Sequence, residues 1–198
     1  MKIDLTEIYK GLDEWRAERG ITAESQKEGY LVNLMEELGE LASALRDYEK
    51  LSKADLACYD TVKKVAEHEI IDALCDIAVF TINAGADIPC HLKYTETDTS
   101  KTAYEPDDFN LLVYECACYA GFINNRHVYF NDILGVCAKL CEYYGYNFEI
   151  AMLETIKEIS SRTGAYDENA KKWVKDESDE AKSKWYQANY ELARISNE

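Results

Sequence analysis

Hydrophobic residues recur every three or four positions through most of the chain, which is the period of an amphipathic helix. The first run carries Leu5, Ile8, Leu12 and Trp15, and it stops at Gly20. This spacing predicts a first helix of roughly four turns. None of the long runs alternates with the period of two that a half-buried strand needs. The pattern therefore predicts an all-α fold, a helical bundle.

Two longer periodic segments complete the first half of the chain. One is expected to begin near Glu28, because Ser25 and Glu28 have the S-x-x-E form of a capping box. Its apolar positions continue as far as Leu45. The next periodic segment runs from about Thr61 to Ala86. We expect these two segments to form neighbouring antiparallel helices.

The second half of the chain begins with a break in the periodicity. Pro89 and Pro106 bracket a polar stretch, which predicts a main internal loop over 88–107. Beyond it the apolar spacing predicts three more helices, the last of which is ended by Gly164. Their expected ranges are about 108–124, 130–144 and 148–163.

The chain is then expected to form a single helical catalytic domain over 1–165, followed by a charged C-terminal tail over 166–198. Residues 108–146 have the character of an insertion or a degenerate repeat. Part of this region, LLVYECACYA, can be laid over LMEELGELA of the second helix. Chance similarity between two amphipathic helices explains that echo equally well.

Composition narrows the range of partners. With 198 residues and 47% hydrophobic content, the chain can bury one substantial core. Its 38 acidic and 22 basic residues give a formal net charge of -16, which repels nucleic acid and anionic membranes. An acidic protein can still bind a phosphorylated small molecule if divalent cations lie between carboxylates and phosphates. Seven cysteines without a CxxC pair, and the lack of a signal or membrane-spanning run, predict reduced thiols and a cytoplasmic protein.

Acidic residues interrupt the apolar faces of the second and third helices. With about 100° per residue, Glu37 and Glu40 lie about 60° apart on a partly apolar face. Glu69, Asp72 and Asp76 likewise fall within about 60° of one another on the next helix. Such carboxylates are costly to bury unless a cation neutralises them, and neither helix places a lysine or arginine on that face. Hard oxygen ligands of this kind predict a Mg²⁺ site, with Mn²⁺ as the alternative.

The arrangement E36-E37-x-x-E40 followed by E69-x-x-D72 resembles the signature of the all-α NTP pyrophosphohydrolases. This family includes MazG, the dimeric dUTPases, the dCTP pyrophosphatases and phosphoribosyl-ATP pyrophosphohydrolase. The resemblance covers residues 1–86 and is fainter beyond them. It implies Mg²⁺-dependent hydrolysis of a (deoxy)nucleoside triphosphate to the monophosphate and pyrophosphate. The metal ligands it implies are Glu37, Glu40, Glu69 and Asp72, with Asp76 as an extra acid, and catalytic roles for Glu36 and Glu40.

The nucleotide itself is expected to contact several further residues. The resemblance suggests Asn83 facing the nucleotide, and basic residues near the phosphates. Aromatic stacking on the base suggests two more positions, although a tyrosine in a helical core usually only packs. The candidates are Asn83, Lys157, Arg162, Lys171, Lys172, Lys175, Tyr30 and Trp15, of which the three tail lysines have a solvated charge cluster as the alternative.

Several alternatives remain open at the level of sequence. The substrate is expected to be a broad set of nucleotides, with a dUTP or dCTP specialist or a phosphoribosyl-ATP hydrolase as alternatives. A homodimer is expected, because relatives pair their bundles, although a decayed repeat would allow a monomer. A dinuclear iron protein needs Glu-x-x-His pairs, and none is present. A non-catalytic helical binding protein with a remnant site is the rival from another class.

Overall fold

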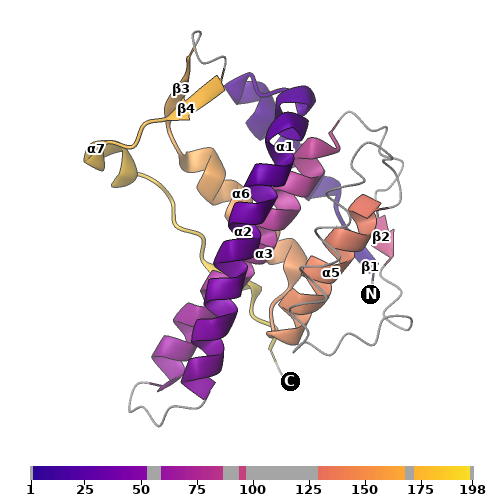
Figure 1. Ribbon diagram of the computed structural model, residues 1–198, viewed down its shortest axis with the longest axis vertical. Coiled ribbons are helices and arrows are strands. Elements are labelled where there is room, and N and C mark those ends of the chain that lie inside the picture. The colour runs from indigo at the N-terminus through magenta and orange to yellow at the C-terminus, as the bar shows by residue number, and fades with distance from the viewer. Residues whose placement is uncertain (1, 53–58, 87–93, 97–128, 168–171, 197–198) are drawn as a thin grey trace.

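The computed structural model describes residues 2–52, 59–86, 94–96, 129–167 and 172–196 (Figure 1). Helices dominate this part of the chain, so the prediction of an all-α fold is confirmed. The helices are α1 (Thr6–Arg19), α2 (Ala23–Ser52), α3 (Tyr59–Ala84), α5 (Tyr129–Tyr143), α6 (Phe148–Ser161), α7 (Asp179–Lys182) and the short 3-10 helix η1 (Tyr190–Ala193). The strands are β1 (Lys2–Asp4), β2 (Tyr94–Glu96), β3 (Gly164–Asp167) and β4 (Lys172–Lys175), and they form two antiparallel ribbons, β1–β2 and β3–β4.

The junction between α1 and α2 is short and well capped. Gly20 ends α1, as predicted, in the left-handed conformation with φ 63°. The predicted start of α2 near Glu28 is wrong, because the helix already begins at Ala23. Thr22 is the residue that caps it: its hydroxyl oxygen accepts a hydrogen bond from the backbone N–H of Ser25 at 3.2 Å. The expected capping box therefore lies inside the helix.

Helices α2 and α3 form a long antiparallel pair through the centre of the molecule (Figure 1). Near one end the hydroxyl groups of Tyr30 and Thr81 lie 3.0 Å apart. Toward the other end the ammonium group of Lys63 lies 6.0 Å from the centre of the Tyr48 ring. The number of residues from Tyr30 forward to Tyr48 on α2 equals the number from Thr81 back to Lys63 on α3, as expected for two antiparallel helices in one register. The two contacts fix the register of α2 against α3.

Helices α1, α5 and α6 pack around α3, which is largely buried from Ala66 to its end at Ala84. The predicted helices in the second half agree closely with α5 and α6, so residues 129–143 of the suspected insertion belong to the same bundle. The predicted helix over 108–124 and most of the predicted loop over 88–107 lie outside the described residues.

Gly164 has a different role from the one predicted. Helix α6 ends at Ser161, and Gly164 begins strand β3. A Cβ atom at this position would come within 2.3 Å of the Val174 carbonyl oxygen and 2.5 Å of the Trp173 ring. The glycine therefore permits the close approach of the two hairpin strands rather than ending the helix.

The C-terminal tail packs back onto the bundle. After the β3–β4 hairpin and α7, which lies apart from the bundle in Figure 1, the chain returns along α6 and α3. The Asn147 N–H donates to the Ala193 carbonyl at 2.6 Å, and the Ile195 N–H donates to the Gly145 carbonyl at 2.8 Å. The described part of the tail is thus an ordered component of the fold.

Three cysteines of the described region, Cys75, Cys137 and Cys141, are buried free thiols, as expected. Burial, together with the neighbouring Cys75, raises the pKa of Cys141 well above its usual range, which makes it a poor nucleophile. Within the described residues, no helix is both long enough and apolar enough to cross a membrane.

Candidate functional site

The register of α2 and α3 determines which of their acids meet. Because Tyr30 lies opposite Thr81, Glu37 lies level with Leu74 and therefore between Asp72 and Asp76. Glu37, Asp72 and Asp76 are all half-buried. Helix α6 brings a further carboxylate to the same place. We define the acidic cluster as Glu37 and Glu40 of α2, Asp72 and Asp76 of α3, and Glu158 of α6, because the charges of Glu37, Glu40 and Glu158 each raise the pKa of at least one of the two aspartates.

Glu37 is the most informative member of the acidic cluster. Burial raises the pKa of its carboxyl to about 7, and the negative charges of Glu40 and Asp72 add to this shift. Its Oε2 atom is buried and has no hydrogen-bond partner among the described residues. A buried carboxylate oxygen normally accepts at least one hydrogen bond. This oxygen is therefore available to a ligand that carries positive charge.

The two aspartates of α3 differ in how they are held. Burial, followed by the charges of Asp72 and Glu37, raises the pKa of Asp76 well above its usual range. No described residue donates a hydrogen bond to Asp76. The pKa of Asp72 is also raised by burial, but the Tyr190 hydroxyl opposes this by donating to Asp72 Oδ1 at 2.5 Å. One aspartate is thus fixed by a donor and the other is not.

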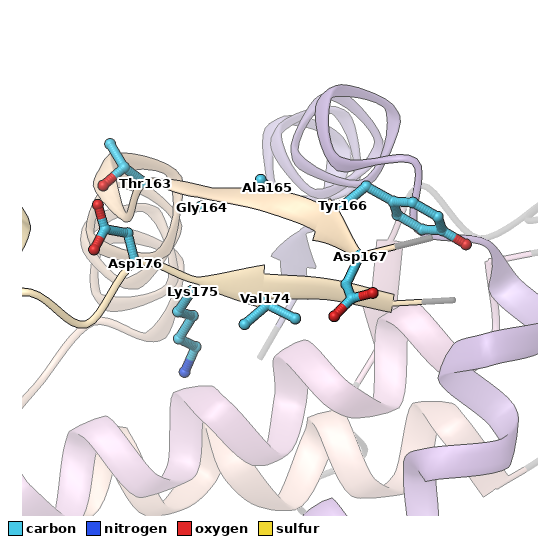
Figure 2. Close-up of a pocket in the computed structure, with 8 residues that line it drawn as sticks. All are labelled: Thr163, Gly164, Ala165, Tyr166, Asp167, Val174, Lys175 and Asp176. Atoms are coloured by element: carbon cyan, nitrogen blue, oxygen red, sulfur yellow. The ribbon is translucent and has the colours of Figure 1, made fainter. Parts of the chain in front are cut away.

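Among the described side chains, two cations border the acidic cluster. Arg162 at the end of α6 donates to Glu158 Oε1 at 2.8 Å, and its charge lowers the pKa of both Asp72 and Asp76. Lys175 of strand β4 lowers the pKa of Glu37. Figure 2 shows the Lys175 side chain extending from the hairpin toward the helices beneath it. The same hairpin carries a shallow hollow lined by Thr163, Gly164, Ala165, Tyr166, Asp167, Val174, Lys175 and Asp176.

These two cations partly neutralise a face that was expected to lack basic residues. Neither α2 nor α3 supplies a basic residue to the shared face, but Arg162 and Lys175 reach it from α6 and the hairpin. The charges of Arg162 and Lys175 offset only part of the effect of burial and of the neighbouring acids. The pKa values of Glu37 and Asp76 therefore remain raised. The acidic cluster is therefore incompletely neutralised by the described side chains.

Glu36 and Glu69 lie outside the acidic cluster. Both are exposed, and neither has a hydrogen bond or ion pair with a described residue. Glu69 lies one turn from Asp72 on α3 and level with Ala42 of α2. Across the described part of the chain, no three His, Cys, Asp or Glu side chains stand close enough to hold a metal ion as they are. A cation shared by α2 and α3 would require the exposed Glu40 and Glu69 side chains to turn inward.

The residues expected to face the base are mostly engaged in packing. Tyr30 is 1% exposed, and its hydroxyl contacts Thr81 inside the core. Trp15 is half-buried, and its indole Nε1–H donates to the Ile159 carbonyl at 3.3 Å. Asn83 is completely buried, where its Oδ1 accepts a hydrogen bond from Arg16. The Asn83 side-chain nitrogen has no partner within the described residues.

The remaining basic candidates are distributed unevenly. Lys157 is exposed and forms an ion pair with Glu154 at 2.5 Å, away from the acidic cluster. Lys172 lies in strand β4, and its side chain is not among those described, while Lys171 lies outside the described residues. Of the basic candidates whose side chains are described, Arg162 and Lys175 are the two that act on the acids.

Sequence reasoning missed two members of the site. Glu158 lies one helical turn before Arg162, so the i,i+4 spacing offered a signal for a paired acid near the predicted basic residue. Tyr190 had no such signal, because it lies 118 residues from Asp72 in the sequence.

No family model, no curated protein and no solved structure matches this chain. The residues of the acidic cluster and the cations beside it therefore carry the functional argument.

Proposed function

We propose that this chain is a cytoplasmic, Mg²⁺-dependent nucleoside triphosphate pyrophosphohydrolase, which converts a (deoxy)nucleoside triphosphate and water into the monophosphate and pyrophosphate. The observation that carries the proposal is the buried Oε2 atom of Glu37, which receives no hydrogen bond from any described residue, at a level of α2 that falls between Asp72 and Asp76 of α3. Leaving a buried carboxylate oxygen unpaired costs several kcal/mol, on the order of a lost charged hydrogen bond or more. A bound cation would remove this cost.

The donor chemistry fits a hard divalent cation. Glu37, Asp72 and Asp76 offer carboxylate oxygens, and the described part of the cluster includes no thiolate or imidazole, which suits Mg²⁺ or Mn²⁺ rather than zinc. The exposed Glu40 and Glu69 are able to complete the ligand set. Bound there, the cation would neutralise phosphate charge and lower the pKa of an attacking water.

The chain's own cations would hold the phosphates. Arg162 presents a planar guanidinium at the edge of the acidic cluster, a geometry that matches two phosphate oxygens. The Lys175 side chain extends from the hairpin toward the helices (Figure 2), and its positive charge acts on Glu37. Glu36 is exposed beside Glu37 and would orient the attacking water or bind metal. In-line attack at the α-phosphorus would release pyrophosphate toward these two basic residues.

The described residues offer little to distinguish one base from another. Tyr30 and Asn83 are sealed in the core, and Trp15 is half-buried with its indole N–H bonded to the Ile159 carbonyl. Broad activity on nucleoside triphosphates is therefore the substrate class we propose. A dUTP or dCTP specialist, or a phosphoribosyl-ATP hydrolase, would need base contacts from elsewhere.

Pyrophosphate release from a panel of ribo- and deoxynucleoside triphosphates, with Mg²⁺ or with EDTA, tests the proposal. We expect Mg²⁺-dependent cleavage that falls at least 100-fold in Glu37→Gln and Asp72→Asn. Glu28→Gln is the matched control, because Glu28 is an exposed glutamate on the same helix. Failure to cleave any nucleotide with Mg²⁺ or Mn²⁺, or full activity in both cluster variants, would overturn it.

One observation favours a non-catalytic helical binding protein instead. Arg162 already lowers the pKa values of Asp72 and Asp76, so part of the acidic cluster is compensated without any ligand. In that case Arg162→Gln would destabilise the fold and the protein would show no magnesium-induced thermal shift. An enzyme would show a clear shift in the unmodified protein.

A further inference from the structure

The segment that follows α7 crosses two helices of the acidic cluster. We call residues 186–195 the C-terminal strap. Its middle portion forms η1, in which Tyr190 and Ala193 are 4% and 1% exposed. Such burial is typical of a core position rather than of a chain end. The strap is therefore built into the bundle at the level of the acids.

Ion pairs and hydrogen bonds hold the outer part of the strap against α3. Glu191 accepts hydrogen bonds from Lys64 at 3.1 Å and pairs with His68 at 3.0 Å. Arg194 donates to the buried carboxylate of Glu67 at 2.8 Å, and its guanidinium lies 4.5 Å from the centre of the Tyr146 ring. These contacts fix the position of η1 along α3.

The inner part of the strap contacts the acidic cluster directly. The Ala188 N–H donates to Glu158 Oε2 at 2.8 Å. The Tyr190 hydroxyl donates to Asp72 Oδ1 at 2.5 Å and lies 3.0 Å from the Thr155 hydroxyl. An ionised carboxylate can only accept, so the single phenolic hydrogen of Tyr190 goes to Asp72.

We infer that the C-terminal strap completes the acidic site, and that Tyr190 is the positioning residue that fixes the Asp72 carboxylate for cation binding. The inference rests on the proposed function. With Oδ1 held by Tyr190, the second oxygen of Asp72 points in one direction, and the rotational freedom that a cation would have to remove is already lost. Asp76 receives no hydrogen bond from the described part of the chain and so has no equivalent restraint there.

Replacement of Tyr190 by phenylalanine isolates this role, because it keeps the buried ring and removes only the hydroxyl. Mn²⁺ binding, followed by loss of the free-ion electron paramagnetic resonance signal, is the readout. We expect Tyr190→Phe to bind Mn²⁺ about 10-fold more weakly, which is the usual effect of removing a group that orients a metal ligand. The secondary structure by circular dichroism should be unchanged.

The strap supplies a matched control. The Tyr186 hydroxyl donates a hydrogen bond to Glu154, a carboxylate outside the acidic cluster. Tyr186→Phe therefore removes a tyrosine hydroxyl from the same strap, as Tyr190→Phe does, without touching Asp72. Thr155→Val removes the other hydroxyl near Tyr190 and leaves the bond to Asp72. Both variants should bind Mn²⁺ within twofold of the unmodified protein.

The outcomes separate the two proposals. If the unmodified protein binds Mn²⁺ and Tyr190→Phe binds it equally well, the role of Tyr190 is overturned and the proposed function stands. Equal weakening in Tyr186→Phe would also overturn it, since the effect would then reflect general loosening of the strap. If the unmodified protein binds no Mn²⁺ at all, both proposals fail. If Tyr190→Phe does not fold, Thr155→Val decides: a folded Thr155→Val protein that binds Mn²⁺ within twofold of the unmodified protein supports the inference, and one with weakened Mn²⁺ binding overturns it.

Discussion

Replacing Glu37 with glutamine removes one ionisable group from the acidic cluster and keeps the side-chain shape. The pKa of Glu37 in the folded protein is about 7, against an ordinary value of 4.5. Between these pH values the folded protein retains a proton that the unfolded chain releases. The ionisation of Glu37 therefore leaves the free energy of unfolding unchanged below about pH 4.5. It lowers this free energy progressively as the pH rises to about 7.

The size of the effect follows from the pKa difference. One pKa unit corresponds to about 1.4 kcal/mol. The difference between 4.5 and about 7 corresponds to at most roughly 3 kcal/mol, and because Glu37 is only half-buried, solvent screening reduces the expected loss of stability above neutral pH to about 1–2 kcal/mol. Glutamine does not ionise in this range. Without divalent cations, Glu37→Gln should be more stable than the unmodified protein at pH 8, by about 1–2 kcal/mol, and the two should agree at or below pH 4.5.

Urea unfolding followed by circular dichroism, in EDTA at several pH values from 4.5 to 8, measures this difference. Glu28→Gln serves as the control, and it should track the unmodified protein at every pH. Saturating Mg²⁺ should reverse the order, because only the unmodified protein gains the cation. If Glu37→Gln and the unmodified protein lose stability equally as the pH rises, then Glu37 is not a buried, uncompensated acid and the reasoning fails.

Three further predictions concern the metal, the hairpin and assembly. The magnesium-induced thermal shift should grow between pH 6 and pH 8, because Glu37 must lose its proton to bind a cation; an equal shift at both pH values would contradict this. Gly164→Ala should cost about 1–3 kcal/mol in urea unfolding, because its Cβ would press on the facing strand, and a neutral result would show that the hairpin relaxes freely. On α2, the apolar side chains of Leu31, Val32 and Met35 are 54%, 63% and 53% exposed, and we expect them to form the contact between two copies of the chain. Light scattering should therefore show a dimer, which Met35→Glu should convert to a 22.7 kDa monomer. A monomeric unmodified protein would refute this contact.

The helices were predictable because their signal is repeated many times along each one. Apolar positions at helical spacing specified α1, α3, α5 and α6 to within a few residues, and Gly20 marked the end of α1. The start of α2 was misjudged because two residues compete as caps, and Thr22 lies where the chain leaves Gly20. The strands are only three or four residues long, so they carry no measurable period of two.

The acidic cluster was predictable only in part, for a geometric reason. The spacing along a helix gives the direction of a side chain around the axis, and this brought Glu37, Asp72 and Asp76 together correctly. The same angular positions also placed Glu69 on this face of α3. They do not indicate, however, which part of the α2–α3 pair the other elements cover. The structure leaves Glu69 exposed. The strap contact of Tyr190 depends on the whole path of the tail, which no local pattern encodes.

The charges around the acidic cluster also lead to an expectation about the form in which the substrate arrives. Among the described side chains, five acids against the two cations Arg162 and Lys175 leave three negative charges when all are ionised (five minus two). With one divalent cation bound, the site would still be negatively charged. It would therefore repel a free triphosphate, which carries about four negative charges of its own at neutral pH. We therefore expect the nucleotide to bind as its magnesium complex, with the second cation reducing the repulsion. Initial rates measured at fixed total nucleotide should follow the concentration of the magnesium complex, and excess metal-free nucleotide should not compete for the site. Strong competitive inhibition by metal-free nucleotide would mean that Arg162 and Lys175 alone overcome the acids, and that the cluster does not need the second charge.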